Sequence, residues 1–320
     1  MPVHRLTPTR AGLLVAALLP VSTLAQAAGA ADDAYPRFIG PLASPAPPLP
    51  KGAGNIEPYL VTTTAPARFD AHGNRLDNQA PAQWDVIVPI QYGLTDRLTL
   101  GATLAAAYDR LAAGRREAAA GDTTISALYG LHDSDGPSRF RLAAGIRQRL
   151  PSGRHDHLEE RRTPGSGSGA SSTTLALQSQ AYFLDGHLRA RAAMSWRVPG
   201  SHARVHGASV YETGAGFAGK ARLDASWTGT VSAEYSVDPR WTLVAEAMYE
   251  RDEGTLLRGS NSDGSIVDAR APMSWRLSLL PAVQYHFNDN VGVIAGVQLA
   301  LAGRNTAAIV APQVAVNIGF

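Results

Sequence analysis

After residue 54, hydrophobic side chains recur at every second position over most of the chain. Residues 83–94 show the pattern, with one parity occupied by Trp84, Val86, Val88, Ile90, Tyr92 and Leu94. The other parity carries mainly polar or small residues, such as Gln83, Asp85 and Gln91. Because side chains on a strand point alternately to its two faces, this period predicts strands with one apolar face. A chain patterned in this way must fold mainly as β-sheet.

The same period recurs often enough to predict a sheet of many strands. We expect twelve strands, at residues 54–64, 83–94, 98–109, 122–131, 139–150, 173–184, 187–198, 222–236, 240–251, 272–287, 290–302 and 308–320. Most of these ranges are near the ~9–11 residues that a tilted strand needs to cross a lipid bilayer. The strand lengths therefore suit a membrane-spanning sheet.

The connections between the expected strands alternate between short and long. The short ones are residues 95–97, 132–138, 185–186, 238–239 and 288–289, and the long ones are 65–82, 110–121, 151–172, 199–221 and 252–271. Only the last hairpin, around residues 303–306, is short on the long-loop side. Outer-membrane barrels combine short periplasmic turns with longer external loops, so this alternation is typical of that class.

Aromatic residues on the apolar parity gather near the two ends of the expected strands, with Ala, Leu and Val between them. The girdle residues are Trp84, Tyr92, Tyr108, Trp196, Trp227, Trp241, Trp275 and Tyr285. Two aromatic girdles around an aliphatic band indicate a lipid-facing surface. A soluble sandwich would place its large aromatics at mid-strand.

The C-terminus continues the strand pattern to the last residue. Val316, Ile318 and Phe320 share the apolar parity, and such an ending resembles the signal read by the barrel-assembly machinery of Gram-negative outer membranes. In lipid every strand needs a neighbour, so the last strand should pair with the first. We predict an all-β fold, a transmembrane antiparallel β-barrel of about twelve strands closed by the strand that ends in Phe320. A strand end in a secreted β-domain is the alternative.

The first residues have the features of a secretory signal peptide. Arg5 and Arg10 are followed by an apolar run at residues 11–19, which Pro20 ends before it could span a bilayer. A small-x-small cleavage pattern stands at residues 25–27, and a second candidate follows it at residues 28–30. We therefore expect export to the cell outer membrane.

Three regions follow from these patterns. We assign residues 1–27 to the signal peptide, 28–52 to a Pro/Ala-rich periplasmic N-terminal segment and 53–320 to the barrel. The Pro/Ala-rich segment should be extended and poorly packed. Whether it plugs the barrel from below stays open. The chain has no cysteine, which excludes a structural disulfide and a lipid-anchor cysteine.

The parity opposite the apolar one should face the barrel lumen, because charged groups there can stay hydrated or paired. The pore-lining candidates are Arg139, Arg141, Arg147, Arg149, Arg189, Arg191, Arg197, Arg276, Asp85, Asp224, Glu234 and Glu246. One interpretation is a network of salt bridges that fills a narrow barrel. The other is an arginine ladder that guides anionic groups of a solute through a water-filled pore.

Several motifs resemble chemical sites. Residues 214–219 match G-x-G-x-x-G, but a strand is expected next, whereas a dinucleotide site needs a helix. His155 and His157, with Glu159 and Glu160, could bind a divalent metal weakly, although charged external loops are common. Residues 261–264 offer oxygen ligands for calcium but lack the closing glutamate. Ser179 is the odd polar residue on the lipid face. We predict no catalytic, cofactor-binding or metal residues.

Four stretches resemble a known family when taken together. They are residues 93–101 (GLTDRLTLG), 121–123 (GDT), 150–153 (LPSG) and 165–168 (GSGS). In this order they resemble outer-membrane barrels named for the meta pathway of phenol degradation, over about residues 55–320. The family more often has Thr where Ser152 stands. The resemblance implies a transporter-like barrel, distantly similar to fatty-acid and aromatic-hydrocarbon channels.

The leading functional hypothesis is a passive channel or transporter for small solutes, possibly aromatic or anionic compounds. The alternatives are a closed structural or adhesive barrel that works through its external loops, and a membrane-embedded hydrolase, although we expect no enzymatic activity. The expected partners are outer-membrane lipid or lipopolysaccharide, the barrel-assembly machinery and a small-molecule solute. Nucleic acid is not expected, because basic residues and aromatics form no joint patch and the exported chain has a net charge near zero.

Overall fold

The computed structural model describes residues 36–320, except 79, 81, 111–115, 137 and 159–164. These residues belong to one compact unit that begins at Ala34. Within the described ranges, no helix has the length and apolar character needed to cross a membrane. The short 3₁₀ turn η1 (Leu184–Gly186) connects two of the strands.

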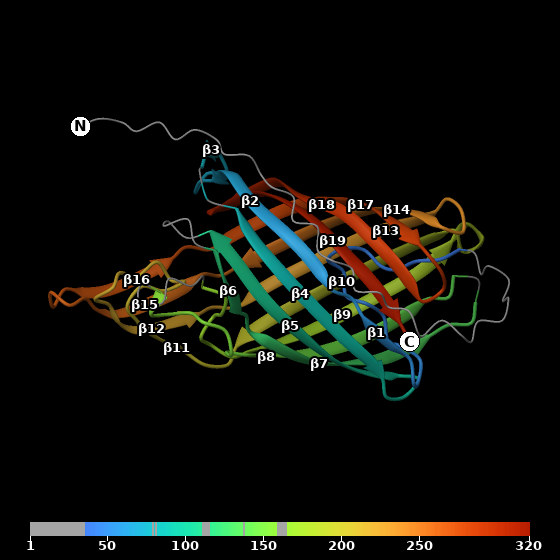
Figure 1. Ribbon diagram of the computed structural model, residues 1–320, viewed down its shortest axis with the longest axis horizontal. Coiled ribbons are helices and arrows are strands. Elements are labelled where there is room, and N and C mark those ends of the chain that lie inside the picture. The colour runs from blue at the N-terminus through green and yellow to red at the C-terminus, as the bar shows by residue number, and fades with distance from the viewer. Residues whose placement is uncertain (1–35, 79, 81, 111–115, 137, 159–164) are drawn as a thin grey trace. The chain divides into compact units, whose positions relative to one another are not determined.

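A closed antiparallel β-barrel forms the body of the molecule (Figure 1). Its twelve strands are β2 (Tyr59–Phe69), β4 (Gln83–Gly93), β5 (Leu98–Arg110), β7 (Thr123–Asp133), β8 (Arg141–Leu150), β9 (Ser172–Phe183), β10 (Leu188–Pro199), β13 (Ser226–Ser236), β14 (Trp241–Asp252), β17 (Ser274–His286), β18 (Val291–Arg304) and β19 (Thr306–Gly319). Each strand pairs with its neighbour in sequence, and β19 pairs with β2 to close the sheet. The predicted all-β transmembrane barrel is confirmed.

The seam of the barrel is completed by the chain ends. Strand β1 (Gly54–Ile56) lies between β19 and β4, and Gly54 exchanges two backbone hydrogen bonds with Phe320, of 2.7 and 3.0 Å. The sequence predicted one strand over residues 54–64, whereas the structure has β1 and then β2. Pro58 separates them, because proline has no N–H to donate to the ladder. The last residue is therefore part of the sheet, which leaves no open edge at the seam.

The long loops carry strands of their own. Strands β3 (Arg75–Asp77) and β6 (Arg116–Ala120) extend the barrel wall, whereas β11 (Ala203–His206), β12 (Ala218–Leu223), β15 (Thr255–Ser260) and β16 (Ile266–Ala271) form a separate four-stranded sheet. Figure 1 shows this external sheet projecting from one end of the barrel. It has a small core, in which Ala203, Val205 and Phe217 are buried. The predicted strand 222–236 is thus divided between the external sheet and the barrel.

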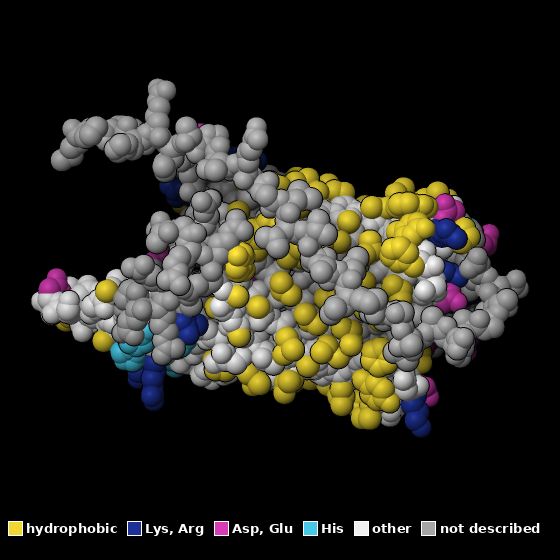
Figure 2. All heavy atoms as spheres, in the orientation of Figure 1, with side chains coloured by type: hydrophobic (Ala, Val, Ile, Leu, Met, Phe, Trp, Pro, Cys, Tyr) yellow, Lys and Arg dark blue, Asp and Glu magenta, His cyan; other side chains and the backbone are white. Residues whose placement is uncertain are grey.

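The outer wall of the barrel is apolar and exposed. Mid-strand residues such as Val231 and Met194 expose more than half of their surface, at 59% and 56%. Figure 2 shows hydrophobic side chains covering the barrel wall, with charged side chains gathered at its ends. A soluble protein rarely exposes so large an apolar surface, whereas a lipid bilayer covers it. The protein is an outer-membrane β-barrel.

The expected girdle residues lie on this outer face. Trp84, Tyr92, Tyr108, Trp196 and Trp241 are exposed, and the other three are partly covered. The partial burial comes from stacking between neighbouring strands. The ring centroids of Trp196 and Trp227 are 5.4 Å apart, and those of Trp241 and Tyr285 are 4.8 Å apart.

If the wall faces lipid, a charge introduced at mid-strand should destabilise the barrel, whereas in a soluble barrel it would not. Val231→Arg would place a charge in the middle of β13, where lipid solvation costs about 2–4 kcal/mol of folding free energy. Ile266→Arg is the matched control, because Ile266 is 86% exposed but lies on the external sheet. Urea unfolding in lipid vesicles should show a loss for Val231→Arg alone. Equal stability of the two variants would contradict lipid contact at Val231.

Candidate functional site in the barrel lumen

Residues 36–50, here called the lumen segment, run inside the barrel. They form no helix or strand, and their backbone is satisfied by inward-facing side chains of the wall. Ile39 N donates to Gln284 Oε1 at 2.9 Å, and Leu49 N donates to Thr99 Oγ1 at 2.7 Å. The Pro/Ala-rich segment was expected to be extended and poorly packed. It is extended, but its described part is packed, because the wall supplies the hydrogen bonds that a proline-rich chain cannot make with itself.

A buried ion pair lies in the short-turn half of the lumen. Arg189 on β10 donates to both carboxylate oxygens of Glu234 on β13, at 2.7 and 2.8 Å. Gln284 connects this pair to the lumen segment, since its Nε2 donates to Glu234 Oε1 and to Gly40 O, both at 2.8 Å. The Phe38 ring covers the Arg189 guanidinium at 4.8 Å. A buried ion pair is tolerated when its remaining hydrogen bonds are satisfied, as they are here.

Two further predicted lumen residues hold the segment directly. Glu246 on β14 accepts hydrogen bonds from Ala43 N at 2.8 Å and from Ser44 Oγ at 2.6 Å. Arg191 on β10 donates to the carbonyl of Pro45. Arg191 and Glu246 are both buried. These two side chains therefore bind the segment, and they are not free to meet a passing solute.

An apolar patch on the inner wall receives Leu42. The patch consists of Val244, Met248, Leu280 and Ile294, all buried. Leu42 can approach the wall this closely only because residue 296 is glycine. A Cβ at Gly296 would lie 2.7 Å from Leu42 Cδ1. Sequence reasoning missed this patch. The sequence did contain a signal for this patch, because three strands carry apolar residues on their inward parity. A lumen filled only with water would not require apolar residues there.

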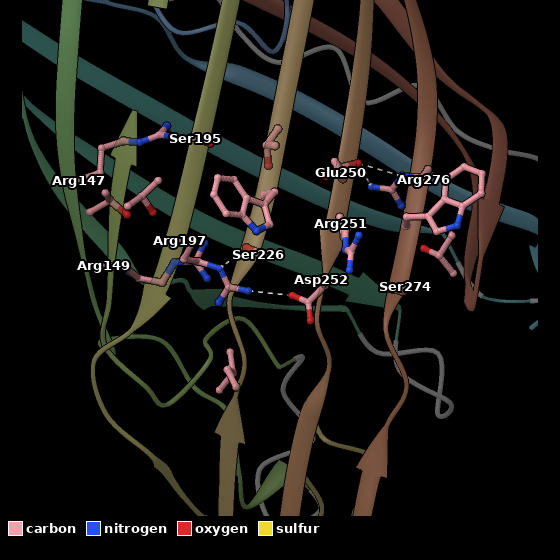
Figure 3. Close-up of a pocket in the computed structure, with 17 residues that line it drawn as sticks. Arg147, Arg149, Ser195, Arg197, Ser226, Glu250, Arg251, Asp252, Ser274 and Arg276 are labelled. Carbon is pink, nitrogen blue, oxygen red and sulfur yellow. Dashed lines mark hydrogen bonds and ion pairs between the residues drawn. The ribbon is translucent and has the colours of Figure 1, made fainter. Parts of the chain in front are cut away.

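A cavity of about 550 Å³ occupies the long-loop end of the lumen. Its wall includes Arg147, Arg149, Arg197 and Arg276, which come from β8, β10 and β17. Arg197 pairs with Asp252 at 2.9 Å, and Arg276 pairs with Glu250 at 2.5 Å. Figure 3 shows Arg147 and Arg149 on one side of this cavity, and no dashed line joins either of them to another of the residues drawn.

Arg147 and Arg149 thus differ from the other lumen arginines. Within the described part of the chain, neither makes an ion pair or a side-chain hydrogen bond. Their cross-strand neighbours include Thr124 on β7, opposite Arg149, and Thr174 on β9, opposite Arg147, and both are neutral. The cavity therefore has an excess of positive charge at this wall.

A second cavity, of about 450 Å³, lies beside the lumen segment. Leu42, Tyr59, Val61, Ile87 and Leu128 contribute apolar surface to it. Arg147 lines this cavity as well as the first one. The two cavities therefore share one charged wall residue.

Four other predicted pore-lining residues lie away from these cavities. Arg139 is in the short turn before β8, with its guanidinium 5.9 Å from the Tyr182 ring. Arg141 pairs with Asp133 at 3.0 Å near the same end. Asp85 is half-buried and accepts a hydrogen bond from Gln83 at 2.8 Å.

Asp224 is the fourth, and it is not on a barrel strand. It lies in the connection between β12 and β13, where it forms ion pairs with Arg222 at 3.5 Å and with Arg270 of β16. The predicted strand 222–236 placed it in the lumen. The break between β12 and β13 moves it to the rim, where it connects the external sheet to the barrel.

The family-like landmarks at residues 121–123, 150–153 and 165–168 meet at one point of the external rim. The Asp122 carboxylate accepts hydrogen bonds from Gly153 N at 2.9 Å and from Ser168 N and Oγ at 2.8 and 2.7 Å. Ser152 Oγ binds the flanking strand, accepting from Thr123 N at 2.9 Å. Tyr211 donates to Ser168 O, and burial raises the pKa of Tyr211 to about 12, so it stays a donor. These contacts fix residues 152–153 and 168 at the rim.

Three remaining motifs have structural settings. Residues 214–217 form a turn and residues 218–219 begin strand β12, so the helix that a dinucleotide site requires does not follow. Residues 261–264 form the turn between β15 and β16. Ser179 lies on β9, opposite Leu142 and Ala192. Glu159 and Glu160 lie outside the described residues.

Sequence comparisons identify no relative of the chain. No protein-family model matches it, and no curated protein matches it. Solved structures do match. An outer membrane channel from Pseudomonas putida F1 aligns with a TM-score of 0.64 and 16% identity, covering 85% of this chain and 97% of that chain. At this identity the match shows a common fold.

Two weaker matches are a deletion mutant of the TodX monoaromatic hydrocarbon channel and the toluene transporter TbuX of Ralstonia pickettii. TodX aligns at a TM-score of 0.44 with 13% identity, over 85% of this chain and 90% of its own. TbuX aligns at 0.42 with 14% identity, over 85% and 89%. Similarities this low carry no argument about function.

The seat of Leu42 generates a prediction about the lumen segment. Leu42→Gln would bury an amide among apolar side chains, which costs about 1–3 kcal/mol. Hydrogen exchange of residues 36–50 in the folded protein should then accelerate by roughly tenfold to a hundredfold, as 1.4 kcal/mol is a factor of ten. The matched control is Ala43→Gln, since the neighbouring Ala43 is exposed. Equal exchange in the two variants would contradict the seating of Leu42.

Proposed function

We propose that the protein is a passive channel for small anionic solutes that also carry an apolar group, such as aromatic acids. The observation that carries this proposal is that Arg147 and Arg149, at the wall of the long-loop cavity, have no ion-pair or side-chain hydrogen-bond partner among the described residues. A charge that the fold does not neutralise is available to a passing ion. Passive transport needs no cofactor, metal or catalytic group.

The chemistry of the arginine wall favours carboxylates or similar anions. Guanidinium groups match carboxylate and phosphate geometry, and they stay charged at any physiological pH. Inside a narrow lumen with low-dielectric walls, their field raises the local concentration of anions. Weak, sequential contacts allow a solute to enter and leave, as a conducting pore requires.

The second cavity supports an apolar group on the same solute. Arg147 stands at the junction, and beyond it the wall presents Tyr59, Val61 and Ile87. A solute with a carboxylate and a ring could keep its charge at Arg147 while its ring contacts this wall. The Pseudomonas barrel that shares the fold is itself described as a channel, which agrees with this proposal.

The remaining expectations from the sequence belong to the same proposal. A signal peptide at residues 1–27 would export the chain, and the apolar C-terminal strand would be read by the barrel-assembly machinery. Lipopolysaccharide would contact the aromatic girdle at the long-loop end of the barrel. The resemblance to the barrels named for the meta pathway of phenol degradation supports a transporter, and we propose no enzymatic activity.

A closed barrel that acts through its external surface is the second candidate. The lumen segment fills much of the short-turn half, and the ordered external sheet offers a surface for a partner. In this case solute would not cross. A measurement of current and flux separates the two candidates.

The channel proposal predicts a specific role for Arg147. In planar bilayers with a salt gradient, the reversal potential of the wild type should indicate preference for anions. Arg147→Gln should reduce that preference, and in vesicles it should lower the ratio of benzoate to benzamide permeation several-fold. The matched control is Arg258→Gln, because Arg258 lies on the external sheet and pairs with Asp268.

Two results would overturn the proposal. One is the absence of current and of solute flux in protein whose folding is confirmed by heat-modifiable gel mobility, which would favour the closed barrel. The other is an equal effect of Arg147→Gln and Arg258→Gln. That result would assign the anion preference to general surface charge instead of the cavity.

A further inference from the structure

A cluster of metal-ligating side chains lies on the external loops, apart from the lumen. It contains Asp156 and His157 from the loop between β8 and β9, and His206 at the end of β11. One ligand atom from each residue can be chosen so that all three lie within 4.8 Å of one another. Figure 2 shows histidine side chains gathered at the end of the molecule that carries the external sheet.

The backbone around the cluster is fixed by hydrogen bonds between the loop and β11. His157 N donates to His206 O at 3.0 Å, and Leu158 N donates to Ala208 O at 3.0 Å. Asp156 Oδ2 accepts from His206 N at 3.0 Å and lies 3.6 Å from His206 Nδ1. The three ligand-bearing residues are therefore held together by contacts that do not depend on a metal.

His157 has an unusual backbone conformation, with a φ of 52°. A positive φ is uncommon for residues other than glycine and merits a functional hypothesis where it occurs. Here the two imidazole rings of His157 and His206 stack, with centroids 5.7 Å apart and planes at 14°. The conformation thus brings together two rings whose residues are far apart in sequence.

His155 is not part of the cluster. Its Nε2 lies 2.7 Å from Arg204 O, and its ring packs against Gly169, where a Cβ would lie 2.3 Å from His155 Cδ2. The two histidines of the His-x-His motif therefore have different roles. His155 binds the backbone of β11. The sequence motif predicted His155 as the partner of His157, whereas in the structure the partner is His206.

We propose that Asp156, His157 and His206 form a binding site for a borderline divalent metal ion such as Zn²⁺. Two imidazoles and one carboxylate are a common set of protein ligands for such ions, with a further position open to water. Bonds of about 2.0–2.2 Å require ligand atoms somewhat closer together than 4.8 Å. Rotation of the exposed His206 side chain would supply this approach. The ion would connect residues 156–157 to the external sheet.

The site is tested by titrating the full-length refolded protein with Zn²⁺ in a calorimeter. We expect saturable binding of one ion per chain, no comparable binding of Mg²⁺, and at least tenfold weaker Zn²⁺ binding in His206→Ala. Asp156→Asn should also weaken binding, while it keeps an oxygen to accept from His206 N. The matched control is His202→Ala, because His202 is an exposed histidine of the same external loop.

A second measurement separates a bridging ion from binding by scattered surface histidines. Zn²⁺ should slow hydrogen exchange in residues 153–158 and 204–210 together in the wild type, and it should not do so in His206→Ala. Heat-modifiable gel mobility checks that each variant is folded. Absence of one-to-one binding, or equal binding by the wild type and His206→Ala, would overturn the proposal.

Discussion

Backbone hydrogen bonding in lipid is the constraint on which the rest of the structure depends. Since the bilayer core offers no water to an unpaired N–H or C=O, a spanning sheet must close on itself. Here closure uses the pairing of β19 with β2 and the short strand β1, which completes the seam at Phe320. Closure also determines the environment of every side chain on the wall, because one parity faces lipid and the other faces the lumen.

A barrel of twelve strands encloses more space than its own side chains fill, and the chain uses its two halves differently. In the short-turn half, the lumen segment occupies the space. Arg189 and Glu234 pair with each other beside it, and Glu246 accepts a hydrogen bond from its backbone. In the long-loop half, Arg197 and Arg276 are paired across the wall, whereas Arg147 and Arg149 form no ion pair with any residue that the structure describes. The lumen therefore contains both salt bridges that hold the structure together and arginines that a solute could meet.

The sequence predicted the barrel well because strand periodicity is a local signal. The parity of aromatics such as Trp84 and Trp196 indicated the lipid face, and the alternation of loop lengths indicated the barrel class. The lumen segment could not be placed in this way, because a Pro/Ala-rich stretch has no period and its partners are spread over many strands. Tyr182, an aromatic on the inward parity, was one hint, since its ring lies 6.0 Å from that of Phe38.

Long-range contacts account for the other differences between sequence and structure. Asp224 was expected in the lumen, but a strand break and two arginines hold it at the rim. His157 was expected to act with His155, yet the external sheet brings His206 to it. The landmarks around Asp122 were recognisable as motifs, but only the fold shows that they form one hydrogen-bonded junction.

The seating of the lumen segment inside the barrel is the central claim, and a disulfide tests it directly. The chain has no cysteine, and Ser44 Oγ of the lumen segment donates to Thr230 Oγ1 of β13 at 2.8 Å. The double variant Ser44→Cys/Thr230→Cys, assembled in outer membranes and mildly oxidised, should form an intramolecular disulfide in most molecules, seen as a shift in non-reducing gel mobility. If the two cysteines stay reduced in folded barrels, residues 36–50 do not occupy the lumen.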